Sequence, residues 1–261
     1  MSGSEPPAPV DFDRLAVYYD LEHHDITDDL QPLAEFARAS SGPILELACG
    51  TGRVLPALAV ASQTVVGLDY SKAMLKRAQR RVAMEAAPSV IRLLRSDMRS
   101  FRLSTRFGLI VVALNSFMHL TTRSEQEQVL QAIAGHLRPE GRVIIDLFNP
   151  ESTLDESSEG ALLLHCLHYL PEQSAFVLHF HSVRTDRIAQ LVMVDSYYDE
   201  TTADGTTKRH VAPYRLRYLH RAEVELLWQR AGLQIEAVYG DYDLGPAEDG
   251  SPRLLVVARR T

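Results

Sequence analysis

Two glycines separated by one residue follow an apolar run early in the chain. Residues 44–48 are Ile-Leu-Glu-Leu-Ala, and Cys49, Gly50, Thr51 and Gly52 come next, ahead of a helix-like segment. A buried strand that runs into such a turn and then into a helix leaves bare backbone at the carboxyl end of the strand, where open α/β sheets bind ligands. The spacing therefore predicts a nucleotide-like cofactor at this turn.

The same turn lacks features of two other nucleotide sites. A dinucleotide site has a third glycine that lets the helix pack closely, but position 55 is leucine. No lysine followed by serine or threonine closes the loop, so the phosphate cradle of a P-loop is absent from the sequence as well. These departures weigh against a nicotinamide or flavin enzyme, and a nicotinamide-dependent oxidoreductase stays only as an alternative.

Carboxylates follow the next two apolar runs. Asp69 comes directly after the run at 64–68, and Asp97 follows the run at 90–94. A carboxylate at the end of a second strand can accept hydrogen bonds from both ribose hydroxyls. Each aspartate also has an ordinary alternative, as a helix-capping acid beside Ser71 or as a turn residue. We expect Asp69 to bind a ribose.

Two further side chains are candidates for chemistry at the acceptor. His119 lies one helical turn beyond the apolar run at 108–114, and an imidazole near neutral pKa can accept a proton from an incoming amine or hydroxyl. Tyr19 lies in an acidic, aromatic segment, 12–29, which is either a lid over the cofactor or a solvated helix start. For His119 the alternative is a purely structural histidine.

Several histidines and one cysteine lie farther along the chain. They are His165, Cys166, His168, His179 and His181. Histidines that alternate along a strand are typical of a polar sheet face, and no carboxylate stands at a matching spacing. We therefore predict no metal site. Similarly, the helical spacing of the basic residues at 72, 76, 77, 80 and 81 predicts a solvated helix face.

The elements that must position these residues alternate along the first part of the chain. Apolar runs at 43–48, 64–68, 90–94, 108–114 and 142–148 read as strands, and segments 53–61, 71–86 and 122–137 read as helices. Continuous apolar runs that alternate with helices indicate buried parallel strands. The fold class is therefore α/β, with a doubly wound, Rossmann-like and mostly parallel sheet.

The pattern changes after residue 150. Runs at 161–170, 175–183, 188–198 and 210–218 are separated by turn signals, which predicts an inserted antiparallel β-sheet after the fifth strand. A helix at 221–231 and strands at 234–241 and 253–258 follow. We divide the chain into an N-terminal lid segment (1–41), a cofactor-binding core (42–150), the insertion (151–218), and a C-terminal helix with the last two core strands (219–261).

Composition restricts the function classes. The 261 residues carry a formal net charge of −7 with 46% hydrophobic side chains, which is ordinary for a globular domain. An acidic balance with no basic tail disfavours nucleic acid and anionic membranes as partners. No run of 18 apolar residues and no signal peptide is evident, and the two cysteines are far apart, so we expect a cytoplasmic protein. A small molecule is the favoured partner.

The motif from Glu46 to Gly52, with Asp69 after the second strand, resembles that of the class I S-adenosylmethionine-dependent methyltransferases. The resemblance implies S-adenosylmethionine as cofactor, with Glu46 orienting the glycine loop, Asp69 on the ribose and Asp97 on the adenine amino group. The cofactor-binding residues that it implies are Glu46, Ala48, Gly50, Thr51, Gly52, Asp69, Tyr70, Met74, Ser96, Asp97, Met98, Leu114 and Asn115.

Members of this family that methylate nucleobase amines carry Asn/Asp-Pro-Pro-Tyr/Phe after the fourth strand, where this chain has Asn115-Ser116-Phe117. Nucleic-acid adenine methylation is therefore disfavoured. The layout instead resembles the sugar-amine N-methyltransferases, with Tyr19-Asp20 near the start, His119 after strand four and an antiparallel insertion. It implies transfer of a methyl group by in-line displacement to an N or O nucleophile of a small molecule, with His119 and Tyr19 as catalytic candidates.

The insertion is expected to roof the acceptor pocket or to pair its edge strands across a homodimer. The expected walls of that pocket are the aromatic side chains Tyr19, Phe117, Tyr197, Tyr198, Tyr214 and Tyr242. A binding protein of the same fold that holds S-adenosylmethionine without transferring its methyl group is the second alternative.

Overall fold

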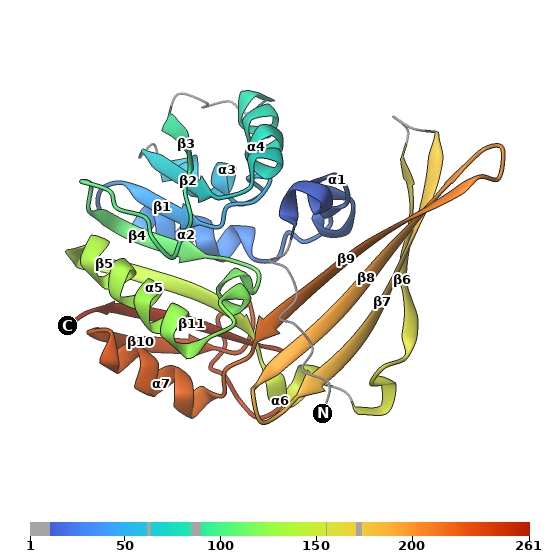
Figure 1. Ribbon diagram of the computed structural model, residues 1–261. Coiled ribbons are helices and arrows are strands. Elements are labelled where there is room, and N and C mark those ends of the chain that lie inside the picture. Colours follow the sequence, from blue (N-terminus) through green and yellow to red (C-terminus); the bar gives the residue numbers. More distant parts are fainter. Residues whose placement is uncertain (1–10, 62–63, 85–89, 155, 171–173) are drawn as a thin grey trace.

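The computed structural model describes residues 11–61, 64–84, 90–154, 156–170 and 174–261, and it contains two separate β-sheets (Figure 1). The larger sheet has seven strands in the order β10-β11-β5-β4-β1-β2-β3. Its strands are β1 (Ile44–Leu47), β2 (Val65–Asp69), β3 (Ile91–Arg95), β4 (Phe107–Val112), β5 (Leu137–Phe148), β10 (Leu233–Tyr239) and β11 (Arg253–Arg260). Strands β1 to β5 pair in parallel, and β11 runs antiparallel to both of its neighbours. The predicted mostly parallel α/β sheet is confirmed.

Helices cover both faces of this sheet, which explains its continuous apolar strands. Leu130 of α5 and Trp228 of α7 pack with Leu45 on one face. Leu33 of α2 and Leu55 of α3 pack with Ile44 on the other. The helices are α1 (Phe12–His23), α2 (Leu30–Ala39), α3 (Leu55–Leu58), α4 (Lys72–Met84), α5 (Arg123–His136), α6 (Pro150–Thr153) and α7 (Arg221–Arg230), with short 3-10 turns at η1 (Ala59–Ala61), η3 (Ser116–His119) and η4 (Glu156–Ser158).

The helix after the glycine loop is shorter than the sequence predicted. The expected segment 53–61 contains only the single turn α3 and the 3-10 turn η1. Pro56 explains the late start, because proline has no N–H to donate and is tolerated only in the first turn of a helix. In the structure Pro56 occupies that first turn. The last two residues of the expected helix at 71–86 lie outside the described residues.

The smaller sheet is the predicted insertion. Its strands β6 (Leu162–Leu170), β7 (Ala175–Asp186), β8 (Leu191–Thr202) and β9 (Thr207–Arg217) pair antiparallel in chain order. Helix α1 lies between this sheet and the rest of the molecule (Figure 1). Leu15 and Tyr18 of α1 pack against Val177 and Tyr198 of the insertion. The predicted lid segment is therefore helical over α1 and α2, while its residues 1–10 lie outside the described part of the chain.

Candidate functional site

A cavity of about 610 Å³ lies where the carboxyl ends of β1, β2 and β4 meet α1 and the inserted sheet. Parallel strands end at the same edge of a sheet, so loops far apart in the sequence meet there. Most of the predicted site residues line this cavity: Tyr19, Ala48, Gly50, Asp69, Tyr70, Met74, Ser96, Asp97, Met98, Leu114, Asn115 and His119. Glu46, Thr51 and Gly52 do not line it; they lie in β1 and in the loop that follows β1.

The glycine loop has a backbone that only glycine adopts easily. Gly50 and Gly52 have φ values of +54° and +78°. A Cβ on Gly52 would lie 3.1 Å from the Cβ of Ala78 on α4, so the close approach of α4 also requires this glycine. A Cβ on Gly50 would make only ordinary contacts with the ring of Tyr19. The backbone of Gly50 is therefore exposed to the cavity, with Tyr19 as its neighbour.

Asp69 is held by the backbone on two sides. One carboxylate oxygen accepts from the N–H of Gly50 at 2.9 Å, and the other accepts from the N–H of Ser71 at 2.8 Å. Each oxygen retains capacity for another hydrogen bond. Asp69 does not have to cap α4, since the Ser71 hydroxyl already does so by accepting from the N–H of Met74. Burial nevertheless raises the pKa of Asp69, against these backbone bonds.

Glu46 is a buried carboxyl group that lacks a full set of partners. Its side chain is almost completely enclosed, and Oε2 makes no hydrogen bond within the described residues. Burial raises the pKa of Glu46 to about 8, although Arg53 acts in the opposite direction. A buried carboxyl group of this kind is stabilised by a nearby positive charge, because desolvation otherwise penalises its ionised form.

Asp97 lines the cavity and forms an ion pair with Arg99. Its carboxylate accepts from the Arg99 guanidinium at 2.6 Å and from the Arg99 backbone N–H at 2.8 Å. These contacts lower the pKa of Asp97. Arg99 also donates to Glu125 at 3.0 Å. The predicted adenine acceptor is thus charged and held in place, with Met98 beside it in the cavity wall.

His119 ends the turn η3 and has apolar rings on two sides. Its ring centroid lies 5.0 Å from that of Phe12 on α1 and 5.7 Å from that of Tyr214 on β9. Nδ1 is buried and has no hydrogen-bond partner among the described residues. Burial lowers the pKa of His119 to about 4. The imidazole is therefore neutral at neutral pH and offers a free nitrogen beside the cavity.

Three of the six aromatic side chains expected as walls do not line the cavity. Phe117 packs on Trp228 in the core, with ring centroids 5.6 Å apart, and Tyr242 donates from its hydroxyl to Asp146 at 2.8 Å. Tyr197 lies under the Arg209 guanidinium, on the opposite face of β8 from Tyr198. Tyr197 and Tyr198 therefore face opposite sides of the inserted sheet, and only Tyr198 lines the cavity. Tyr19, Tyr198 and Tyr214 do line it.

Charged residues that the sequence analysis did not single out also line the cavity. They are Glu22 of α1, Arg99 and Glu125 near the cavity rim, and Arg184, Asp195 and Arg215 of the inserted sheet. Burial raises the pKa of Glu22 to about 7. Arg184 pairs with Asp195 at 3.0 Å, whereas the Arg215 guanidinium contacts no acidic group within the residues that the structure describes. Strand alternation does not single out the last three, because residues of both faces of β8 and β9 line the cavity.

The sequence predicted a solvated basic face on α4, but two arginines of this face contact α1 instead. Arg77 and Arg81 donate to Asp20 of α1 at 3.1 and 2.9 Å. Asp13 of α1 also accepts from the Ser71 hydroxyl at 2.6 Å. These contacts attach α1 to α4 and to the residue before it, while its hydrophobic face packs on the inserted sheet. None of the helices in the described ranges is long and apolar enough to cross a membrane.

Comparison with known proteins shows which proteins this chain resembles. Residues 44–141 match the family described as "Methyltransferase domain". The chain is 27% identical over 244 residues to dTDP-3-amino-3,6-dideoxy-alpha-D-glucopyranose N,N-dimethyltransferase of Streptomyces fradiae, covering 91% of this chain and 89% of that protein. It is 26% identical to dTDP-3-amino-3,4,6-trideoxy-alpha-D-glucopyranose N,N-dimethyltransferase of Streptomyces venezuelae, covering 89% and 97% of the two chains.

A solved structure shares the complete fold, including the insertion. The CcbJ methyltransferase of Streptomyces caelestis superposes with a TM-score of 0.82 over 98% of this chain and 100% of the other, at 23% identity. The likeness therefore extends beyond the seven-stranded sheet and its helices to α1 and the antiparallel sheet, which line the cavity.

Proposed function

We propose that this chain, a class I S-adenosylmethionine-dependent methyltransferase, methylates the amino nitrogen of a small sugar-like molecule. The observation that carries the proposal is that one continuous cavity has two sides. Its donor side is formed by the loops after β1, β2, β3 and β4, and its acceptor side by α1, β8 and β9. A donor and an acceptor bound in one enclosed space can be aligned for direct transfer, and alignment can supply on the order of 7–11 kcal/mol of the barrier.

The donor side fits the cofactor. S-adenosylmethionine supplies an electrophilic methyl group on a positively charged sulfonium. Glu46 has an unpartnered buried oxygen that this charge would stabilise, and Asp69 has spare acceptor capacity for the ribose hydroxyls. Gly50 leaves its backbone bare at the cavity. We therefore retain all the cofactor-binding residues predicted above, with Glu46, Thr51 and Gly52 acting from behind the cavity wall.

The acceptor side suits an amine that is attached to an anionic group. Glu22 and Asp195 place carboxyl groups on this side, and such groups accept hydrogen bonds from an amine. Arg215 supplies a cation with no acidic partner among the described residues, and guanidinium groups bind phosphate well. The two relatives described above have names that specify amino sugars linked to dTDP. A nucleotide-linked amino sugar is accordingly the proposed acceptor class.

We assign His119 to hold the acceptor amine. A neutral imidazole with a free Nδ1 can accept a hydrogen bond from an amine N–H and orient the nitrogen lone pair toward the methyl group. With a pKa near 4, His119 is a weak proton acceptor at neutral pH, so positioning is its larger contribution. Burial raises the pKa of Tyr19, so its hydroxyl stays protonated and acts as a hydrogen-bond donor beside Gly50.

The test is a paired acceptor assay. Purified protein is incubated with S-adenosylmethionine and either nucleotide-linked amino sugars or the matching hydroxyl sugars, and methylated product is measured by mass spectrometry. We expect methylation of the amine and none of the hydroxyl sugar. Methylation of the hydroxyl alone contradicts the proposal. Cofactor binding without product from any acceptor supports the alternative of a binding protein.

Replacing His119 tests its assignment. His119→Ala removes one neutral hydrogen bond, worth about 0.5–1.5 kcal/mol, so kcat should fall roughly 2- to 12-fold. His220→Ala is the matched control, because His220 is half exposed, pairs with Glu151 and does not line the cavity. The assay measures kcat at saturating concentrations of both substrates. A His119→Ala variant with the kcat of the wild type contradicts the assignment.

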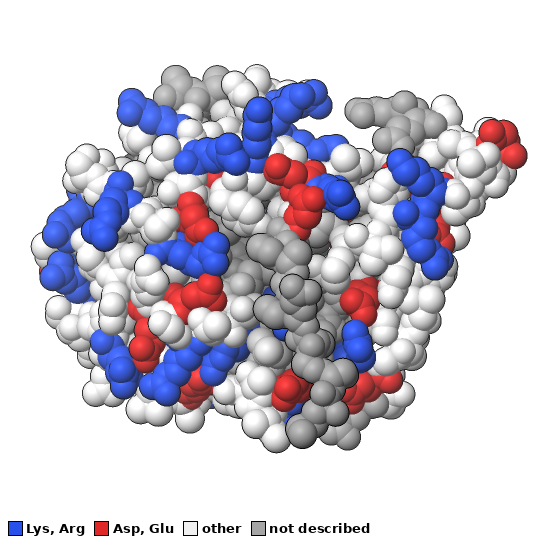
Figure 2. Space-filling view, viewed as in Figure 1, with Lys and Arg blue, Asp and Glu red and all other residues white. Residues whose placement is uncertain are grey.

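We also propose a cytoplasmic location and no role in nucleic-acid binding. Cys49 and Cys166 are both free thiols, which is usual in a reducing compartment. Basic and acidic side chains are interspersed on the face shown in Figure 2, which fits poorly with a continuous phosphate-binding surface. A filter-binding assay with single- and double-stranded oligonucleotides checks the second statement.

A further inference from the structure

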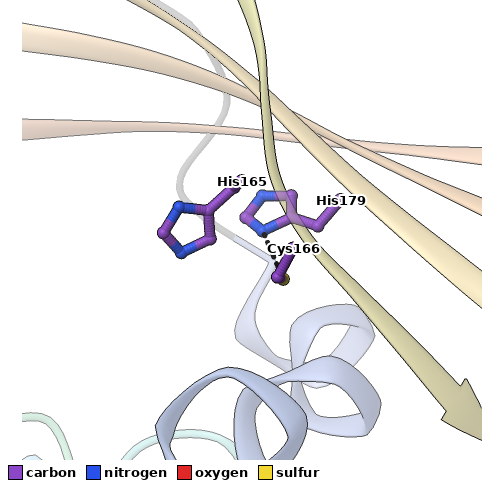
Figure 3. Close-up of side chains that lie close together, drawn as sticks. All are labelled: His165, Cys166 and His179. Atoms are coloured by element: carbon purple, nitrogen blue, oxygen red, sulfur yellow. Dashed lines mark hydrogen bonds between the residues drawn. The ribbon is translucent and has the colours of Figure 1, made fainter.

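The pairing of β6 with β7 contains an irregularity at a group of potential metal ligands. Leu164 is opposite Phe180 and Cys166 is opposite His179, so His165 is an additional residue in β6. Such a β-bulge sets two residues of one strand against one residue of its partner and re-aims a side chain. Here it brings His165 and Cys166 together beside His179, as Figure 3 shows.

The distances within this group are close to those of a metal site. Ligand atoms of His165, Cys166 and His179 all lie within 4.8 Å of one another, and the Cys166 Sγ is 3.9 Å from the His179 Nδ1. Bonds of about 2.0–2.3 Å around a tetrahedral Zn²⁺ separate its ligands by roughly 3.5 Å. The side chains would have to rotate to reach that separation.

Helix α1 contributes the carboxylate that the sequence spacing lacked. Glu22 Oε1 lies 3.1 Å from the His179 Nδ1, but within the described residues it makes no hydrogen bond. Two polar atoms this close that do not share a hydrogen bond are arranged as ligands around a common centre would be. Glu22 is only 14% exposed and His179 only 7%, so water does not readily satisfy them. The four side chains come from three elements.

The side chains in this group offer donor atoms that Zn²⁺ binds, namely imidazole nitrogens, a cysteine sulfur and a carboxylate oxygen. Zn²⁺ binds cysteine as the thiolate, so uptake of the ion would release the proton of Cys166.

We propose that His165, Cys166, His179 and Glu22 bind one divalent transition-metal ion of the Zn²⁺ class. Two imidazoles, a thiolate and a carboxylate are the donors that Zn²⁺ accepts in four-coordinate sites. Because β6 and β7 supply three ligands and α1 supplies the fourth, the ion ties α1 to the inserted sheet. Glu22 also lines the cavity, so the ion would hold in place a carboxylate that the proposed function assigns to the acceptor amine.

Cobalt substitution tests the ligands directly. The protein is treated with a chelator, titrated with Co²⁺ and followed by absorbance, and bound Zn²⁺ is counted separately by mass spectrometry. We expect one ion per chain and a thiolate-to-cobalt charge-transfer band in the near ultraviolet. Cys166→Ser should lose the band and weaken Zn²⁺ binding at least tenfold. His168→Ala, on the same strand but outside the group, should keep both.

Three results overturn the proposal: no metal uptake above a blank, a cobalt spectrum without the thiolate band, or an unchanged spectrum in Cys166→Ser. Circular dichroism of Cys166→Ser establishes that the variant is folded. Hydrogen exchange then tests the role of the ion. Zn²⁺ should slow amide exchange in residues 12–23 of the wild type and leave Cys166→Ser unaffected. If amide exchange in the wild type is the same with and without Zn²⁺, the ion does not hold α1 to the insertion.

Discussion

Asp69 and Glu46 lie on neighbouring strands and are both buried, but they differ in their hydrogen bonds. Asp69 accepts two backbone hydrogen bonds, while Glu46 retains an oxygen without a partner. A carboxylate held by backbone N–H groups is an oriented acceptor, whereas an unpartnered buried carboxyl group responds strongly to any charge that arrives beside it. In the proposed function the two residues therefore serve different parts of the cofactor, the ribose hydroxyls and the sulfonium.

Asp69→Ala should weaken S-adenosylmethionine binding severely. The variant loses two charge-assisted hydrogen bonds, each worth about 1.5–3 kcal/mol, so affinity should fall roughly 100-fold or more. Asp199→Ala is the control, since Asp199 pairs with Arg209 and does not line the cavity. Isothermal titration calorimetry measures both. An Asp69→Ala variant with wild-type affinity would show that the ribose assignment is wrong.

Glu46→Gln should change how stability depends on pH. The pKa of Glu46 is about 8 in the folded protein against an ordinary value of 4.5, so between these values the folded state holds a proton that the unfolded state lacks. The contribution of Glu46 to the free energy of unfolding is therefore full below pH 4.5 and is lost as the pH rises through 8. His119, with a lowered pKa, contributes in the opposite direction between about pH 4 and 6.5.

Urea unfolding at pH 5 and at pH 8 isolates the effect of Glu46, because His119 is common to both proteins. Relative to the wild type, Glu46→Gln should be more stable at pH 8 than at pH 5. The pH dependence of cofactor affinity gives a second check: if the sulfonium favours the ionised carboxylate, affinity should rise with pH in the wild type and less in the variant. An identical pH profile for the two proteins contradicts both expectations.

Helix α1 is the element that joins the two halves of the cavity. Its aspartates contact α4 and the residue before it, and its hydrophobic side chains contact β7 and β8. Asp11 caps its N-terminus by accepting from the N–H of Arg14. Because α1 packs on two separate sheets, its position decides whether Phe12, Tyr19 and Glu22 enclose the bound molecules.

Arg77→Gln should loosen α1 without unfolding the core. The Arg77–Asp20 pair is partly exposed, and such pairs contribute about 0.2–1 kcal/mol, so amide exchange in residues 12–23 should accelerate roughly two- to fivefold at most. Arg80→Gln on the same helix is the matched control, because Arg80 is exposed and forms no ion pair with α1 in the described part of the chain. Equal exchange rates in the two variants would show that the ion pair does not hold α1.

At the scale of the whole molecule, the inserted sheet has one face against α1 and one face that no described element covers (Figure 1). Apolar side chains that are at least half exposed gather on the second face: Leu162, Leu164, Leu167, Tyr169, Phe176 and Val211. Contiguous apolar patches of this kind usually mark an interface. The homodimer predicted from the sequence would cover this face with a second copy, rather than pair the edge strands alone.

Leu164→Asp should dissociate such a homodimer. A charge at the centre of an apolar interface is buried without a partner, which is costly. Ile188→Asp is the control, because Ile188 is 99% exposed in the turn between β7 and β8. Sedimentation velocity should show a dimer for the wild type and for Ile188→Asp, and a monomer for Leu164→Asp. A wild-type protein that is monomeric at micromolar concentration contradicts the prediction.

The sequence by itself determined the core and the donor side of the cavity. Buried parallel strands are continuous apolar runs, and their carboxyl ends meet at one sheet edge, so local pattern was enough to bring Gly50, Asp69, Asp97 and His119 together. The same alternation of runs and turns predicted the antiparallel insertion and its four strands.

Only the tertiary structure decided which residues face the acceptor. Glu22 and Arg215 reach the cavity because α1 and β9 pack against distant parts of the chain, whereas Tyr197 lies outside it under the Arg209 guanidinium. Pairing register and helix docking depend on contacts between residues far apart in sequence, which no local pattern encodes. For the same reason the spacing of residues along the chain did not reveal the carboxylate beside His179, which belongs to Glu22 of α1.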